Sequence, residues 1–151
     1  KMLENSIEVA KALNVKLYLV GSLTDRKYFE ELQRLAKGGN IAFLPNAPPE
    51  KVAELLSRVS VYFHPTIGEH FGMPVAESML AGVVPVVPEE SGASELVPEF
   101  SYSNLDEAKE KVKEALGAPI SLRKEMRERV KDLRPEVFRE RLFERVKPYL
   151  C

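Results

Sequence analysis

The apolar residues of this chain fall into short, largely continuous runs, separated by longer segments in which they recur every three or four positions. A short run rich in β-branched and aromatic residues, bounded by glycine or proline, is typical of a buried β-strand. Runs of this kind predict strands over residues 15–21, 41–44, 59–63 and 83–87.

The segments between these runs carry helical spacing. Leu3, Ile7 and Ala10 would share one face of a helix, and Asp25 stands where an aspartate caps a helix N-terminus. Pro74 suits the first helical position, because its φ is fixed and its missing N–H would be unpaired there. The pattern predicts helices over residues 2–13, 25–37, 48–56, from 74 onward, and over 104–116, 121–133 and 135–149.

Alternating strands and helices predict the α/β class, with a Rossmann-like parallel sheet covered by helices on both faces. In the last helix, Phe138, Leu142 and Val146 form a seam expected to face the core. In such sheets ligands bind beyond the carboxyl ends of the strands. The segment over residues 68–77 follows the end of one predicted strand, so a binding site is expected there.

Residues 68–77 place two carboxylates, Glu69 and Glu77, eight positions apart across a predicted helix start. A helix that begins after a glycine presents free N–H groups and the positive end of its dipole, which favour a bound phosphate. Ionised carboxylates accept hydrogen bonds from hydroxyl groups. A ligand with both phosphates and hydroxyls, such as a nucleotide sugar, fits this combination.

Composition narrows the function classes. A chain of 151 residues has room for one domain. Its net charge of −1 provides no field that would attract nucleic acid, and no apolar run is long enough to span a membrane. The one cysteine, Cys151, excludes an internal disulfide and favours a cytoplasmic location. Charged residues make up 30% of the chain, with glutamate far outnumbering aspartate, a composition seen in thermophile proteins.

No metal is expected at the site. A diphosphate leaving group is commonly stabilised by a divalent metal on paired aspartates, but the chain has aspartate only at positions 25, 106 and 132, which are far apart. A helix N-terminus assisted by basic side chains is the alternative. The sequence therefore predicts a metal-independent site without a cofactor, in which the nucleotide diphosphate sugar is a substrate.

The same region resembles the donor-binding segment of family 4 glycosyltransferases, which are retaining enzymes of the GT-B architecture. Their pattern is a glutamate, any residue, Phe-Gly, four residues, a second glutamate, a small-residue turn and a Pro-Val-Val strand, followed by a Gly-Gly-x-x-Glu loop. The resemblance covers about thirty residues. It consists of Glu69-His70-Phe71-Gly72, Glu77, Ala81-Gly82, Val84-Pro85-Val86-Val87 and Ser91-Gly92-Ala93-Ser94-Glu95, with Ser91 in place of the first loop glycine.

The resemblance implies a role for each matching residue. Glu77 would bind the ribose hydroxyls, and Glu69, the catalytic candidate, would face the donor sugar and the charge that develops at its anomeric carbon. Phe71 and Gly72 would bring the backbone close to the sugar and the diphosphate, and the N–H groups of Met73 and Val75 would hold the distal phosphate. Ser91, Gly92 and Ala93 would donate backbone N–H groups to the sugar hydroxyls. The implied donor-binding residues are Glu77, Phe71, Gly72, Met73, Pro74, Val75, Ser91, Gly92 and, as the basic contributor, Lys1.

The resemblance also implies a domain organisation and a donor. Residues 1–151 would form a single donor-binding domain, lacking the family's first strand and its N-terminal acceptor domain, and inactive alone. The sequence His70-Phe71-Gly72 after the first glutamate resembles the same part of the motif in mannosyltransferases that use GDP-mannose. Transfer of a hexose to a hydroxyl acceptor is the expected reaction, in the cytoplasm or at a membrane surface. A non-catalytic nucleotide-sugar sensor and a GT-B nucleotide-sugar epimerase remain as alternatives.

Overall fold

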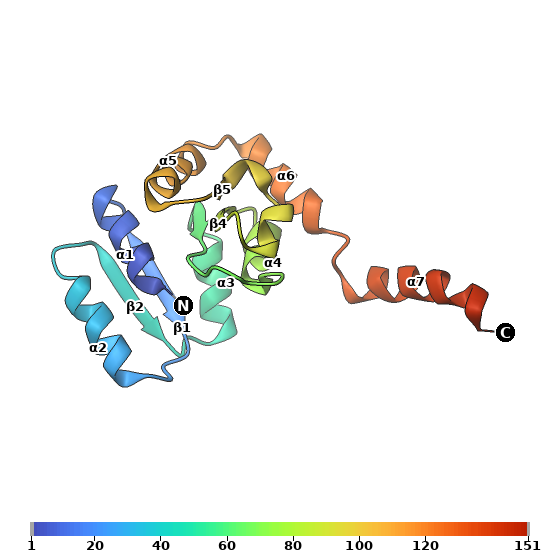
Figure 1. The fold of residues 1–151 in the computed structure, drawn as a ribbon, viewed down its shortest axis with the longest axis horizontal. Coiled ribbons are helices and arrows are strands. Elements are labelled where there is room, and N and C mark those ends of the chain that lie inside the picture. Colours follow the sequence, from blue (N-terminus) through green and yellow to red (C-terminus); the bar gives the residue numbers. More distant parts are fainter. Residues whose placement is uncertain (1, 151) are drawn as a thin grey trace.

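The structure is a computed structural model that describes residues 2–150, in which helices and strands alternate along the chain (Figure 1). Every predicted helix and strand is present, with ends shifted by at most three residues. The elements of this range are α1 (Leu3–Ala12), β1 (Leu17–Gly21), α2 (Arg26–Leu35), β2 (Ile41–Pro45), α3 (Pro49–Leu56), β3 (Val61–Phe63), α4 (Met73–Leu80), β4 (Val84–Pro88), the 3-10 turns η1 (Gly92–Glu95) and η2 (Pro98–Phe100), β5 (Ser101–Tyr102), α5 (Leu105–Leu116), α6 (Ile120–Val130), α7 (Pro135–Val146) and η3 (Lys147–Tyr149).

The first part of the chain builds a unit of β1, β2, α1 and α2. The two strands pair in parallel. The Asp25 carboxylate caps α2 by accepting a hydrogen bond from the Tyr28 N–H at 3.0 Å, as predicted. A small core holds the unit together, centred on the buried side chains of Ile7, Leu32 and Ala36.

The second part forms a parallel sheet in the order β3-β4-β5 and contains the main core. All five residues of β4 are buried, which requires cover on both faces of the sheet. Helix α5 packs against β4, and so do α4 and α6, which also contact each other. This arrangement confirms the predicted α/β class. It places the segment after β3 beside the segment after β4.

The strands of the described residues form two sheets, although the pattern predicted one. Strands β1 and β3 share no ladder hydrogen bonds, so each has one unpaired edge. A cavity of about 460 Å³, lined by residues of both strands and of α1 and α3, lies between them. The hydrophobic pattern identified the strands correctly, but it carries no information on which edges pair.

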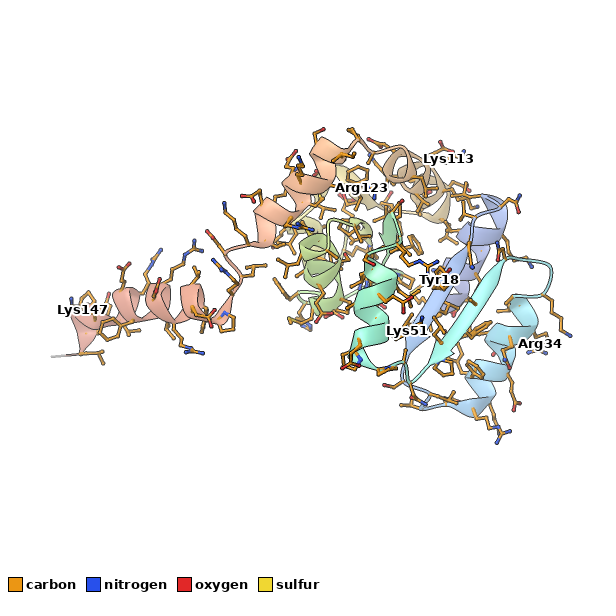
Figure 2. The ribbon with its side chains drawn as sticks, turned by 180° about the vertical axis from the view of Figure 1, so that it is seen from behind. Tyr18, Arg34, Lys51, Lys113, Arg123 and Lys147 are labelled. Carbon is orange, nitrogen blue, oxygen red and sulfur yellow. The ribbon has the colours of Figure 1, made fainter. Side chains whose placement is uncertain are left out.

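Helix α7 projects away from the body of the molecule, with Lys147 near its far end (Figures 1 and 2). The expectation of a core-facing seam on this helix is wrong for this structure. Phe138, Leu142 and Val146 are 63%, 48% and 37% exposed, and no residue of α7 is buried. Helical spacing places these side chains on one face, but it does not supply a surface for that face to contact.

Candidate functional site

The loop between β3 and α4, together with α4 itself, carries most of the predicted site residues. It follows the carboxyl end of β3 and ends at Gly72, the N-cap of α4. Gly68 and Gly72 both have left-handed backbone conformations, with φ of 75° and 80°, which glycine adopts without strain. Between them lie Glu69, which is half-buried, and the exposed residues His70 and Phe71. The loop therefore turns sharply at both ends.

Helix α4 starts one residue earlier than predicted. Met73 is its first residue, so Pro74 occupies the second position. Both positions tolerate proline, because N–H groups of the first turn have no partner within the helix. The Val75 and Ala76 N–H groups donate to the Gly72 carbonyl at 2.8 and 3.2 Å.

The expectation that Val75 offers its N–H to a phosphate is therefore not met in this structure, because that group is already hydrogen-bonded. Met73 was the other predicted donor. Its N–H makes no hydrogen bond within the described part of the chain. Its side chain is 62% exposed. The open donor at the start of α4 is thus the Met73 amide.

The two carboxylates of the motif act on a common neighbour, Tyr62 of β3. Burial of its phenol, with smaller contributions from the negative charges of Glu77 and Glu69, raises the pKa of Tyr62 to about 12. Glu77 is exposed on α4, and Glu69 comes from the loop. The charges of both acids therefore act on one phenol of β3.

Tyr62 was not predicted as a site residue. Its hydroxyl lies 3.4 Å from Nδ1 of His64, and the His64 carbonyl accepts a hydrogen bond from the Tyr102 hydroxyl at 3.0 Å. The sequence offered one indication of this role: Tyr62 lies in the short predicted strand that directly precedes the motif.

The segment after β4 contacts the loop from the other side. Ser91 and Gly92 were expected to donate backbone N–H groups to the sugar, but both amides are used within the protein. The Ser91 N–H donates to the Pro88 carbonyl at 3.0 Å, and the Gly92 N–H donates to the Glu69 carbonyl at 2.8 Å. The Ser91 hydroxyl caps η1 by accepting from the Ala93 N–H at 3.2 Å. In this structure the segment supports the loop.

The site contains few cations. The chain has no lysine or arginine between Arg58 and Lys109, a stretch that includes the loop, α4 and η1. Lys1, the predicted basic contributor, lies outside the described residues. Basic side chains act instead on Tyr18 of β1. A side-chain hydrogen bond with Lys16 and, to a smaller extent, the charges of Lys16, Arg58 and Lys51 lower the pKa of Tyr18.

A concave region lies at the carboxyl ends of β1 and β2. It is a cavity of about 500 Å³ whose lining includes Asp25, Phe43 and Pro45. Asn46, with φ of 54°, ties the two strand ends together: its N–H donates to the Gly21 carbonyl at 2.8 Å, and its side-chain oxygen accepts from the Leu23 N–H at 3.0 Å. This cavity lies where ligands bind in parallel sheets.

The described residues contain neither a metal-binding cluster nor a membrane-spanning helix. Among residues 2–150, no three His, Cys, Asp or Glu side chains are grouped so that they could hold a metal ion. Within the same range, none of the helices has both the length and the apolar character needed to cross a bilayer.

Comparison with known proteins assigns the chain to a family. The model of the family described as "Glycosyl transferases group 1" matches residues 1–133. A Dictyostelium discoideum protein named GDP-Man:Man(3)GlcNAc(2)-PP-Dol alpha-1,2-mannosyltransferase is 40% identical over 90 residues, which are 55% of this chain and 18% of that protein. A Yarrowia lipolytica protein of the same name is 36% identical over 69 residues, 44% of this chain and 11% of that protein. The chain thus spans less than a fifth of either relative.

A solved structure shares the fold. The catalytic domain of cholesterol-alpha-glucosyltransferase from Helicobacter pylori superposes with a TM-score of 0.64, covering 86% of this chain and 85% of that one. Sequence identity is 20%, so this similarity concerns the fold alone.

Proposed function

This chain belongs to the family of group 1 glycosyl transferases, and we propose that it is the donor-binding domain of a retaining, metal-independent glycosyltransferase of family 4. The observation that carries the proposal is where the fold places the two carboxylates: Glu69 lies in the loop that ends at Gly72, the N-cap of α4, and Glu77 stands on α4 itself. A helix start next to two hydroxyl-binding acids suits a nucleotide diphosphate sugar.

In this proposal Glu77 accepts hydrogen bonds from the ribose hydroxyls, and Glu69 faces the sugar. The Met73 N–H and the positive end of the α4 dipole hold the diphosphate, with Lys1 as the basic contributor. Gly72 lets the diphosphate approach the backbone closely, and Phe71, which is 39% exposed, flanks the sugar. Pro74 and Val75 shape the first turn of the helix.

The chemistry proposed is transfer with retention through an oxocarbenium-like transition state. The bond from the anomeric carbon to the diphosphate oxygen breaks, and a bond to the acceptor oxygen forms on the same face. The acceptor proton passes to the departing diphosphate. Glu69 stabilises the positive charge that develops on the sugar. We assign no protein nucleophile.

We propose GDP-mannose as the donor. Both curated relatives are named as GDP-mannose-dependent mannosyltransferases, and His70 in the motif is in keeping with this donor.

A hydroxyl acceptor would be bound by a separate acceptor domain, as in GT-B enzymes. The isolated chain is then expected to bind the donor without transferring it. A cytoplasmic location, at a membrane surface or free of it, and a thermophilic source complete the proposal.

Calorimetric titration of the purified chain with GDP, UDP and ADP tests the proposal. We expect GDP to bind most tightly, and GDP-mannose to bind at the same site in competition with it. If a well-folded chain bound none of these nucleotides, the proposal would be rejected. Formation of a new glycosidic bond by the full-length protein would separate an enzyme of this class from a sensor or an epimerase.

A further inference from the structure

We infer that Gly92, together with Ser91, positions Glu69 for its contact with the donor sugar, so that the segment after β4 is the support of the loop that follows β3. This inference rests on the proposed function, because it assigns Glu69 to the sugar. Neither residue needs to touch the donor in this role.

Two hydrogen bonds meet at the Glu69 carbonyl. The Gly92 N–H donates to it at 2.8 Å, and the Ser91 hydroxyl lies 3.4 Å from the same oxygen. Ser91 is only 2% exposed and also caps η1, so its hydroxyl is held in one place. The backbone of Glu69 is therefore fixed from two adjacent residues of a segment more than twenty positions away in sequence.

The contact at Gly92 leaves no room for a side chain. A Cβ at this position would lie 1.8 Å from the His70 carbonyl oxygen and 2.8 Å from its carbon. Both atoms belong to the backbone, so no rotation of a side chain relieves the overlap. Gly92 begins η1, and its φ lies outside the left-handed region. Close approach to the loop, and not backbone freedom, is thus what requires glycine here.

The loop depends on such support because of its own conformation. Gly68 and Gly72 bound it on either side, and residues 69–71 between them are neither helix nor strand. A short loop between two glycines has little intrinsic preference for one conformation. Glu77, by contrast, stands on a regular helix. Displacing the loop should therefore move Glu69 and leave Glu77 in place.

The contributions of Glu69 and Glu77 to binding can be measured separately with two ligands. GDP reports on the ribose and diphosphate contacts, whereas GDP-mannose also reports on the sugar contact. We expect Gly92→Ala to weaken GDP-mannose binding about tenfold, the loss expected when a hydrogen bond to a charged group is removed, and to leave GDP binding within about twofold. Gly117→Ala is the matched control, since its Cβ would meet only ordinary contacts at 3.7 and 3.8 Å.

A double-mutant cycle shows whether the loss occurs through Glu69. Glu69→Gln should show the same selective loss, and adding Gly92→Ala to it should weaken GDP-mannose binding little further. If Gly92→Ala prevents folding, Ser91→Ala, which removes only the hydroxyl, should show a smaller loss in the same direction. Equal weakening of GDP and GDP-mannose, unchanged binding, or additive losses would overturn the inference. Failure of the parent chain to bind either probe would instead overturn the proposed function.

Discussion

At the scale of single residues, the pKa of Tyr62 reports the negative charge that Glu69 and Glu77 bring to the site. Burial of its phenol and the charges of two carboxylates raise its pKa to about 12, so the hydroxyl stays protonated well into the alkaline range. The carboxylates carry negative charge into a stretch of chain without lysine or arginine. Hydroxyl groups, which donate hydrogen bonds without adding negative charge, are therefore suitable partners for these acids. A nucleotide sugar supplies them at both ends of its diphosphate.

Glu77→Ala should weaken GDP binding by about tenfold to a hundredfold, because it removes a charged acceptor for the ribose hydroxyls. Glu77 is exposed on α4, so the melting temperature should stay within a few degrees of the parent value. Calorimetry with GDP measures the effect, and Glu136→Ala on the projecting helix α7 is the control. Binding equal to that of the parent would refute the role given to Glu77.

Tyr62 should make stability depend on alkaline pH. A phenol with a pKa of about 12 in the folded chain and about 10 in the unfolded chain binds its proton more tightly when folded. The stabilisation that this shift adds to the free energy of unfolding is complete below about pH 10, and it is lost as the pH rises from about 10 to 12.

Urea unfolding at a series of alkaline pH values should therefore show a difference between the parent and Tyr62→Phe that shrinks by about 2 kcal/mol over this window. The phenylalanine variant keeps the ring, and Tyr102, whose pKa is also raised by burial, is present in both proteins. A constant difference across the window would contradict the assignment.

At the scale of elements, the hydrophobic pattern predicted the helices and strands well, because local spacing determines which residues can share a face. It failed where an element is too short to show a period, as in the two-residue strand β5. It predicted α7 as a helix, but it was wrong that the apolar face of α7 packs on the core, since none of its residues is buried. The start of α4 was predicted to within one residue, since glycine and proline have strong positional preferences.

The N-cap of α4 offers a test of why Gly72 is glycine. An added Cβ would lie 3.1 Å from a Val75 methyl and 3.2 Å from the Ala93 Cβ, at a φ of +80°. Gly38 has nearly the same φ, +79°, with open space around it. Gly38→Ala should therefore lower the free energy of unfolding by about 1 kcal/mol through backbone strain alone. Gly72→Ala should lower it distinctly more, because the added Cβ also meets close contacts. Chemical denaturation compares the two, and equal losses would show that the contacts at Gly72 relax freely.

Helix α7 should contribute little to the stability of this chain. Its residues are not buried, and the pair Arg141–Asp132 is an exposed ion pair, of a kind that contributes little. A chain ending at Arg134 is therefore expected to melt within about two degrees of the parent. Met126→Ala in α6, whose side chain is fully buried, should instead lose about 2–5 kcal/mol. A large drop in the melting temperature on truncation would show that α7 packs on the body in solution.

At the scale of the whole molecule, the site depends on contacts between segments that are distant in sequence. The motif residues were identifiable because their types and spacing match a known pattern. The contact of Gly92 with the Glu69–His70 backbone was not, because nothing in either segment alone encodes their approach. The same limit applies to the sheets: the unpaired edges of β1 and β3 follow from strand order in space, and the pattern along the chain does not contain that order.

The two sheets should also differ in local stability. Strand β4 is buried along its whole length in the main core, whereas the unit of β1, β2, α1 and α2 rests on a small core around Leu32. Native-state hydrogen exchange should therefore show β1 and β2 amides opening at a free energy roughly 1–3 kcal/mol below that of β4 amides. Leu32→Ala should speed exchange in β1 and β2 and leave β4 nearly unchanged, because only the first unit loses packing. Equal acceleration in both sheets would mean that the molecule opens as one cooperative unit, and that the cavity between β1 and β3 does not divide it.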